Sequence, residues 1–226
     1  HSFPTRRSSD LLVAQVLTVP VTHFAPFLIF VGVVTFLSSK ATRWRDMGRV
    51  GIGLGLMLVA LRMIGGLAQP LQASATLQVL MEALAGETLP LVLLAAILTW
   101  VAHSSLAIVL LVASLAMGGL VTLDTGAALI LGANLGGTMP PIIASLTEGV
   151  VARRIAFGNA SFKIIGVIIA IIFMKPALEV INQIGGTSGQ QLVNLHGLFN
   201  LGLGVVFIGL IGFAGRLTTR FMPAKA

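Results

Sequence analysis

The sequence contains no cysteine and no tyrosine, and only 9% of its 226 residues are Asp, Glu, Lys or Arg. The absence of cysteine excludes disulfides, thiolate metal sites and cysteine nucleophiles. So small a charged fraction excludes a water-soluble domain, in which about a quarter of the residues are charged. Hydrophobic residues instead make up 56% of the chain, and the mean hydropathy is +1.01. This composition predicts an all-α, polytopic helical membrane protein.

The net charge of +7 is distributed in short basic clusters between apolar runs. Binding to nucleic acid would require these residues to gather on one solvated face, so no nucleic-acid partner is expected. The pattern is instead typical of the positive-inside rule, with basic loops in the cytoplasm. We therefore expect a multi-pass protein of the plasma membrane, the inner membrane in a bacterium, with a cytoplasmic C-terminus. The clusters are Lys40 to Arg49, Arg153 with Arg154, and Arg216 to Lys225.

The chain divides into three parts by composition. Residues 1–10 are polar and end abruptly at an apolar run, so we interpret them as a non-native leader and the chain as a fragment. Residues 11–68 are predicted to form two transmembrane helices joined by a basic cytoplasmic loop. Residues 69–226 are predicted to form a transport domain.

The uncharged run at residues 88–123, one of two runs of equal length, does not fit a single crossing of the membrane. The preceding residues 69–87 hold two glutamates and no basic residue, so they are placed outside the cell. One crossing at 88–123 and one back at 125–147 would then leave Arg153 outside as well. Two crossings before residue 118 would need about 40 residues, which are not available.

The conflict disappears if residues 88–118 enter the membrane, turn and leave on the side where they entered. The sequence thus predicts a re-entrant helical hairpin, a type of element that often marks a transporter's binding site. The remaining predicted spans alternate inward and outward, at 125–147, 159–178 and 192–214.

The predicted tip of the hairpin is its most polar part, with His103, Ser104 and Ser105. A helix starting near Ser104 would present free backbone N–H groups and the positive end of its dipole, which suit an oxyanion. The alternative is that both serines bond back to helix carbonyls, as is common in membrane helices.

The span at 125–147 contains Gly-Ala-Asn-Leu-Gly-Gly-Thr-Met-Pro-Pro at residues 132–141. Glycine and proline weaken or end helices, so this span is predicted to be a broken transmembrane helix. Backbone carbonyls at Gly132 and Gly136, with the side-chain oxygens of Asn134 and Thr138, would form a cage for a hard cation. The alternative is a kinked packing face of small residues.

Two later segments form a weak internal repeat, since Asn159-x-x-Phe162-Lys163 resembles His196-x-x-Phe199-Asn200. It suggests two similarly built helices beside the hairpin. Lys163 is expected near a cytoplasmic helix start, where water would solvate it. No nucleophile–base pair, metal-binding histidine cluster or phosphate-binding loop is present in the sequence, so an enzyme is not predicted.

These motifs resemble those of the sodium-dependent phosphate cotransporter family, the type II Na/Pi group and its bacterial relatives. That family carries two copies of a Gln-Ser-Ser-Ser hairpin, each followed by a span with a Gly-Ala-Asn-Ile-Gly-Thr-Thr motif. Residues 101–105 lie where one such tip falls, and residues 132–138 match the second motif. The resemblance covers about residues 24–214 and is strongest to the second repeat, in a diverged form.

The resemblance implies a secondary active transporter that couples inorganic phosphate to Na⁺, with no other cofactor. It assigns Ser104 and Ser105 to the anion, and Asn134 and Thr138 to sodium. Where the family has Gln, Ser and Thr, this chain has Ala102, His103 and Gly137. His103 is therefore expected to tune substrate binding. The first repeat is not visible, so it or a second chain would complete the site.

These departures keep an alternative open, namely a diverged, non-coupled anion channel or a regulatory membrane subunit. A membrane enzyme is the weakest class, because the spans contain no acid–base pair.

Overall fold

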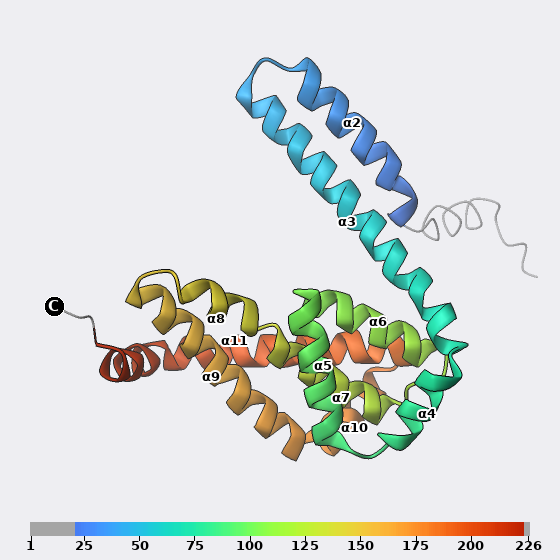
Figure 1. Ribbon diagram of the computed structural model, residues 1–226, viewed down its shortest axis with the longest axis vertical. Coiled ribbons are helices and arrows are strands. Elements are labelled where there is room, and N and C mark those ends of the chain that lie inside the picture. The colour runs from blue at the N-terminus through green and yellow to red at the C-terminus, as the bar shows by residue number, and fades with distance from the viewer. Residues whose placement is uncertain (1–20, 224–226) are drawn as a thin grey trace, which may run out of the picture. The chain divides into compact units, whose positions relative to one another are not determined.

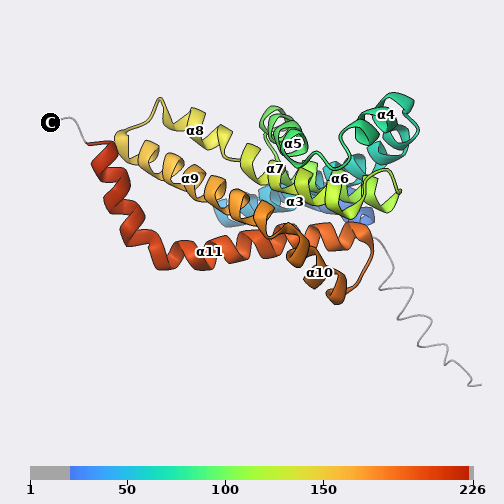
Figure 2. The same ribbon diagram turned by 90° about the horizontal axis from the view of Figure 1, so that it is seen from below.

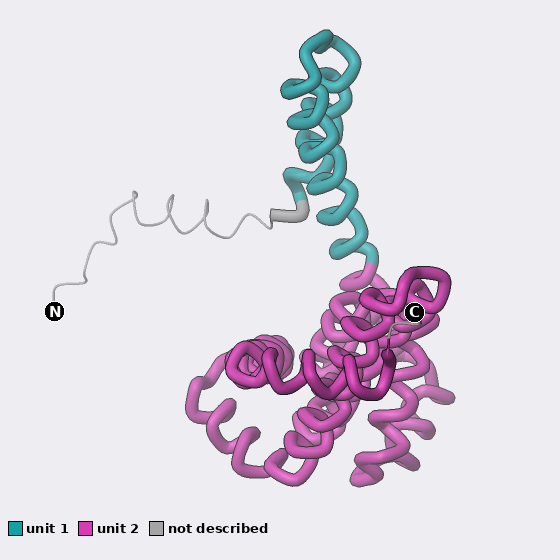
Figure 3. The backbone as a smooth tube through the Cα atoms, turned by 90° about the vertical axis from the view of Figure 1, so that its left-hand side faces the viewer, with its two compact units in different colours: residues 1–63 teal, residues 64–226 magenta. Residues whose placement is uncertain are grey.

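The computed structural model describes residues 21–223, and all regular secondary structure within this range is helical. The predicted leader, residues 1–10, and the start of the first predicted span lie outside the described residues. The chain forms two compact units, residues 1–63 and 64–226, which Figure 3 shows in different colours. The prediction of an all-α fold is confirmed.

Unit 1 contains a short 3-10 helix, η1 (Val21–Phe24), followed by α2 (Ala25–Ser38) and most of α3 (Thr42–Gln72). The two long helices approach closely because glycine lines their interface. A Cβ built on Gly32 would lie 2.7 Å from the Ile52 backbone nitrogen, and one on Gly48 would lie 2.7 Å from the Gly32 carbonyl oxygen. Side chains at these glycines would force the helices apart.

The basic cluster of unit 1 lies mostly on a helix, and of its four basic residues only Lys40 is in the connection between α2 and α3. Arg43, Arg45 and Arg49 belong to the first turns of α3, and only residues 39–41 connect the helices. The guanidinium groups of Arg45 and Arg49 lie 5.0 and 5.3 Å from the centre of the Phe36 ring, within range of cation–π attraction.

Unit 2 is a bundle of helices, shown in two views in Figures 1 and 2. A short helix, α4, and two apolar helices, α5 and α6, precede the central pair α7 and α8. The long helices α9 and α11 follow, joined through α10. Their bounds are α4 (Ala75–Ala83), α5 (Thr88–Ala102), α6 (Ser105–Met117), α7 (Leu123–Gly136), α8 (Met139–Ser145), α9 (Val150–Ile172), α10 (Met174–Ile184) and α11 (Ser188–Phe221).

Four helical segments in the described part of the chain are long and apolar enough to cross a membrane. They are Thr42–Gln72, Leu123–Ser145, Val150–Ile172 and Ser188–Phe221. Helices α5 and α6 have 15 and 13 residues, which corresponds to about 22 and 20 Å of helix. Each is shorter than the hydrocarbon layer, about 30 Å thick, so neither can cross it alone.

Two predicted spans differ in their bounds from the helices. The span predicted at 159–178 begins at Val150 and ends at Ile172, because Arg153 and Arg154 lie in the first turns of α9 rather than in a loop. The span predicted at 192–214 is α11, from Ser188 to Phe221. Thr187 and Gln190 fix its start, since their side chains form a reciprocal capping box.

Helix α10 was not predicted as a separate element. It is amphipathic and buries Leu178 and Ile181 while exposing Lys175. Gly185 and Gly186 follow it with φ of 79° and 98°, a backbone conformation that favours glycine, and they turn the chain into α11.

The core of unit 2 is built around α7. Eleven of its fourteen residues are buried, and it contacts α5, α6, α9, α10 and α11. Helices α9 and α11 instead expose many large apolar side chains. A protein in water would bury such surfaces, whereas lipid chains solvate them. The chain thus has the helices of a multi-pass membrane protein around a small central core.

The start of α9 is bonded to the end of α11. The Arg154 guanidinium donates to the Met222 carbonyl oxygen through Nε at 2.9 Å and through a terminal nitrogen at 2.7 Å. We expect Arg154→Ala to destabilise the last turn of α11 by about 1 kcal/mol, because hydrogen bonds from a charged donor are lost. Hydrogen exchange of residues 218–222 should then become about fivefold faster. Arg153→Ala is the matched control, since Arg153 is exposed; equal exchange in both variants would contradict this role.

Candidate functional site

The apolar run at 88–118 is interrupted at His103 and Ser104, between α5 and α6. His103 has φ of 54°, in the left-handed region, and ends α5. Ser104 then caps α6, since its hydroxyl oxygen accepts from the Ala107 backbone N–H at 3.2 Å. Figure 1 shows that the two helices run in different directions from this point. A straight helix through this segment is thereby excluded; re-entry on one side of the membrane stays a prediction.

The broken helix predicted at 125–147 consists of α7 and α8, with Gly137 and Thr138 between them. Thr138 is buried, and its hydroxyl donates to the Leu135 carbonyl oxygen at 2.7 Å. Pro140 lies at the start of α8, where its missing N–H costs no helical hydrogen bond. Residues 137–138 lie between the two helices, and their backbone N–H groups still donate to the Ala133 and Leu135 carbonyl oxygens at 3.2 and 3.0 Å.

Glycines allow α5 to lie directly on the backbone of α7. A Cβ on Gly132 would overlap the Val92 carbonyl oxygen, and one on Gly136 would overlap the Ala96 carbonyl oxygen. Gly132 and Gly136 are four residues apart and share one face of α7, so the contact extends over a full helical turn. The glycines of the broken span thus form a packing face for the first helix of the hairpin.

The tip of the α5–α6 segment reaches the α7–α8 interruption. A Cβ built on Gly137 would lie 3.4 Å from the Ser105 Cβ and 3.6 Å from its Oγ. Thr99, one turn before the tip, packs against Gly136 and is fully buried. Its hydroxyl is the one buried side-chain polar atom without a hydrogen-bond partner in the described part of the chain. Two helix breaks and an unpaired hydroxyl therefore meet in one region.

Asn134 forms a hydrogen-bond network that joins α7 to α11. Its Nδ2 donates to the Ile130 carbonyl oxygen at 3.0 Å and lies 3.1 Å from His196 Nδ1. Its Oδ1 accepts from Asn200 Nδ2 at 2.8 Å, and Asn200 Nδ2 also donates to the His196 carbonyl oxygen at 2.8 Å. Asn134 is 1% exposed, so this network meets the requirement that buried polar groups be paired.

The predicted site residues thus occupy two adjacent places. Ser105 meets the α7–α8 interruption, whereas Asn134 is turned toward α11 and its two polar side chains. His103 is exposed, and its Nδ1 lies 3.0 Å from the Val101 carbonyl oxygen. The roles of these residues in binding anion or cation stay predictions.

Sequence reasoning did not find Thr99 or the partners of Asn134. A lone threonine in an apolar helix carries no signal. The weak internal repeat that contains His196 and Asn200 marked these two residues as unusual, but it did not indicate that they bind Asn134.

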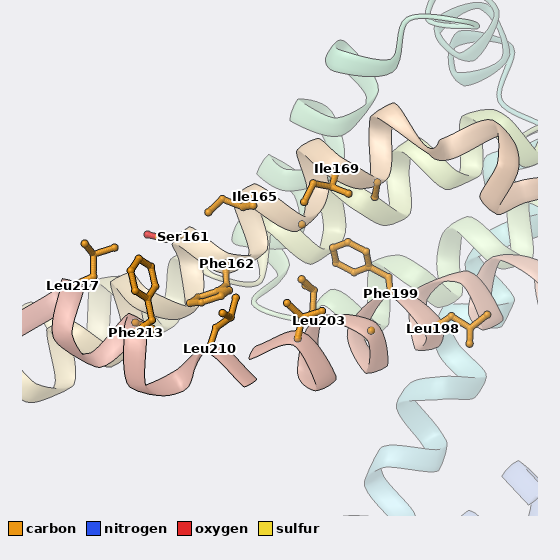
Figure 4. A pocket seen from close by; sticks show the side chains of 15 residues that line it. Ser161, Phe162, Ile165, Ile169, Leu198, Phe199, Leu203, Leu210, Phe213 and Leu217 are labelled. Carbon is orange, nitrogen blue, oxygen red and sulfur yellow. The ribbon is translucent and has the colours of Figure 1, made fainter. Parts of the chain in front are cut away.

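The apolar groove between α9 and α11 is not part of this polar site. It has a volume of about 530 Å³ and is lined by aliphatic and aromatic side chains, with Ser161 as the polar exception. Figure 4 shows side chains of both helices along this groove, among them Phe162 of α9 and Phe199 and Leu203 of α11. An unpaired ion would be strongly disfavoured there.

Comparison with known proteins now identifies the family. The sequence matches the family described as Na+/Pi-cotransporter over residues 11–66 and 68–214. The chain belongs to the Na⁺/Pi-cotransporter family. The resemblance seen in the hairpin and in the glycine-rich motif is therefore confirmed at the level of the family.

Relatives of this family member include two proteins named putative inorganic phosphate export protein YjbB. The one from Salmonella typhimurium is 33% identical over 210 residues, which cover 93% of this chain and 38% of the relative. The one from Escherichia coli K12 is 34% identical over 190 residues, covering 84% and 35%. An uncharacterized Bacillus subtilis protein, YqeW, is 23% identical over 199 residues, covering 88% and 65%. The chain thus spans little more than a third of the YjbB relatives. No solved structure matches it.

Proposed function

We propose that the protein is part of a secondary active transporter that moves inorganic phosphate across the plasma membrane, coupled to Na⁺. The observation that carries the proposal is the meeting of two helix breaks, where Ser105 lies against Gly137. Helix breaks at membrane depth persist where protein, water or a ligand satisfies the freed backbone groups. Family membership and the names of the YjbB relatives support phosphate as the cargo.

The anion is proposed to bind at the start of α6. The first backbone N–H groups of this helix and its positive dipole end favour a negative charge. The Ser104 oxygen already accepts a hydrogen bond from Ala107, so its O–H remains available as a donor. Ser105 adds a second hydroxyl, and His103 would modulate affinity from its exposed position.

Sodium is proposed to bind at the broken span. Asn134 and Thr138 would supply side-chain oxygens, and Gly132 and Gly136 backbone carbonyls. The Asn134 oxygen accepts one bond, from Asn200, and an amide oxygen has a second lone pair. The remaining ligands are proposed to come from a further repeat, in the same polypeptide or in a second one.

Uptake and release of labelled phosphate by membrane vesicles containing the full protein test this proposal. A sodium gradient should accelerate phosphate movement over an equal potassium gradient, and the orientation of the gradient will give the direction of transport. Ser104→Ala should lower the rate at least about tenfold, because one hydrogen bond to a charged ligand contributes about 1.5–3 kcal/mol and each 1.4 kcal/mol is a factor of about ten.

The altered tip, with Ala102 and His103, favours an uncoupled anion channel or a regulatory subunit as the second candidate. Phosphate movement that is equal in both gradients and unchanged in Ser104→Ala would support it over the coupled carrier.

A further inference from the structure

Two carbonyl oxygens at the α7–α8 interruption lack their helical donors. In a helix, each carbonyl oxygen accepts from the N–H group four residues later, and for Gly136 and Gly137 those residues are Pro140 and Pro141. Proline has no N–H group, so neither bond can form. Among residues 21–223, no side-chain hydrogen bond and no backbone hydrogen bond across the interruption reaches either oxygen. The end of α7 therefore presents two acceptors that helix formation does not satisfy.

Thr99 adds a third oxygen at the same place. Its Cβ would lie 2.8 Å from a Cβ built on Gly136, so its hydroxyl, one bond further, lies beside the end of α7. The side chain is fully buried, and its hydroxyl has no hydrogen-bond partner in the described residues. An unpaired buried hydroxyl destabilises a fold unless a water molecule, an ion or a ligand pairs it.

The polar groups at this point favour a cation. Helix carbonyl groups point toward the C-terminal end of the helix, so those of Gly136 and Gly137 face the interruption. They also form the negative end of the α7 dipole. The Thr138 hydroxyl uses its proton toward the Leu135 carbonyl oxygen, which leaves its lone pairs as acceptors. Unwound carbonyl groups at the ends of half-helices are typical ligands of Na⁺ in transporters.

The burial of Thr99 favours a small partner. Its side chain is 0% exposed, so it has no surface that a water molecule or a phosphate ion could touch. A sodium ion without its hydration shell is smaller than a water molecule. Oxygen ligands from the protein can replace that shell, because hard cations bind carbonyl and hydroxyl oxygens.

We propose that the Thr99 hydroxyl oxygen is a ligand of the sodium ion, together with the carbonyl oxygens of Gly136 and Gly137. The inference rests on the proposed function for the identity of the ion, and it adds Thr99 and Gly137 to the ligands considered above. Ser105 lies against Gly137, so the ion would be bound beside the proposed anion site. The opposite charges would attract strongly there, because water is largely excluded.

Thermal unfolding of the purified full protein in sodium chloride and in potassium chloride of equal concentration tests this ligand. Sodium should raise the Tm of the wild type, because an ion that binds the folded state stabilises it. Thr99→Val nearly keeps the shape of the side chain and removes the oxygen. The sodium concentration that gives half of the effect should then rise at least about tenfold, which corresponds to 1.4 kcal/mol.

Two further variants and one further condition serve as controls. Thr99→Ser keeps the oxygen and should retain the sodium effect within about threefold of the wild type. Thr147→Val should leave the effect unchanged, since Thr147 is exposed and its hydroxyl donates to the Ala144 carbonyl oxygen at 3.1 Å. In potassium chloride, Thr99→Val should be at least as stable as the wild type, because it removes an unpaired buried hydroxyl.

Phosphate movement in vesicles separates this inference from the proposed function. A sodium effect on Tm that is lost in Thr99→Val, with phosphate movement that does not respond to the sodium gradient, would support the ligand and contradict the coupled carrier. Sodium-driven phosphate movement with the same sodium dependence in Thr99→Val and in the wild type would overturn the ligand and leave the carrier standing. A wild type with the same Tm in both salts would also overturn the ligand.

Discussion

Gly136→Ala is expected to cause, together with Gly132→Ala, one of the largest losses of stability of any single methyl addition in unit 2. The added Cβ would overlap the Ala96 carbonyl oxygen and lie 2.8 Å from the Thr99 Cβ. A backbone carbonyl cannot rotate away, so α5 and α7 would have to separate. Overpacking typically costs about 1–3 kcal/mol, which for a chain of this size lowers Tm by roughly 2–12 °C. Thermal unfolding of the purified protein measures the shift.

Gly137→Ala provides the matched control one residue away. Its Cβ would meet the nearest atom, the Ser105 Cβ, at 3.4 Å, and its φ of −63° suits any residue. We expect its Tm to change by less than about 2 °C, since no backbone must move. Equal losses in the two variants would show that α5 does not rest on Gly136 as described.

Asn134→Leu is expected to abolish phosphate transport and to destabilise the bundle by about 2–4 kcal/mol. Leucine has the same branched shape and number of side-chain heavy atoms, although it is larger. It leaves the Asn134 hydrogen bond to His196 Nδ1 unmade and one N–H of Asn200 without its acceptor. Each buried polar group left unpaired costs about 1–3 kcal/mol. Unfolding of the purified protein and transport in vesicles measure the two effects.

A double-mutant cycle separates the network from general loss of packing. Asn134→Leu and Asn200→Leu together should cost less than the sum of the single changes, by about 1–2 kcal/mol, because both remove the same hydrogen bond. Asn182→Leu on α10 is the control, since Asn182 is exposed. Strict additivity of Asn134→Leu and Asn200→Leu would mean that their hydrogen bond contributes little.

The polar and helix-breaking residues were the most informative part of the sequence. His103 and Ser104 interrupt an apolar run, and glycine and proline interrupt the next one, so both helix breaks could be placed from local residue types. The ends of the helices were harder to predict from the sequence. Arg153 and Arg154 were interpreted as a loop because charge usually marks one, yet α9 includes them and uses Arg154 to bond the end of α11.

The contacts that define the site are tertiary and carry no local signal. Asn134 and Asn200 are 66 residues apart, and only the packing of α11 on α7 brings their amides together. Lys163 was expected near a helix start, whereas α9 begins at Val150, thirteen residues earlier. Thr99 stands out only because its buried hydroxyl has no hydrogen-bond partner in the described residues, and no sequence pattern shows this.

The glycine contact between α5 and α7 has a mechanical consequence. The carbonyl groups of Val92 and Ala96 pack against Gly132 and Gly136, which lie one turn apart on α7 and have no side chain. If α5 slid along α7, these carbonyl groups would clash with the side chains between Gly132 and Gly136. We therefore expect α5 and α7 to move together as one rigid unit. Any opening at the serine turn would then have to change the contacts that α6 makes with α7 and α11.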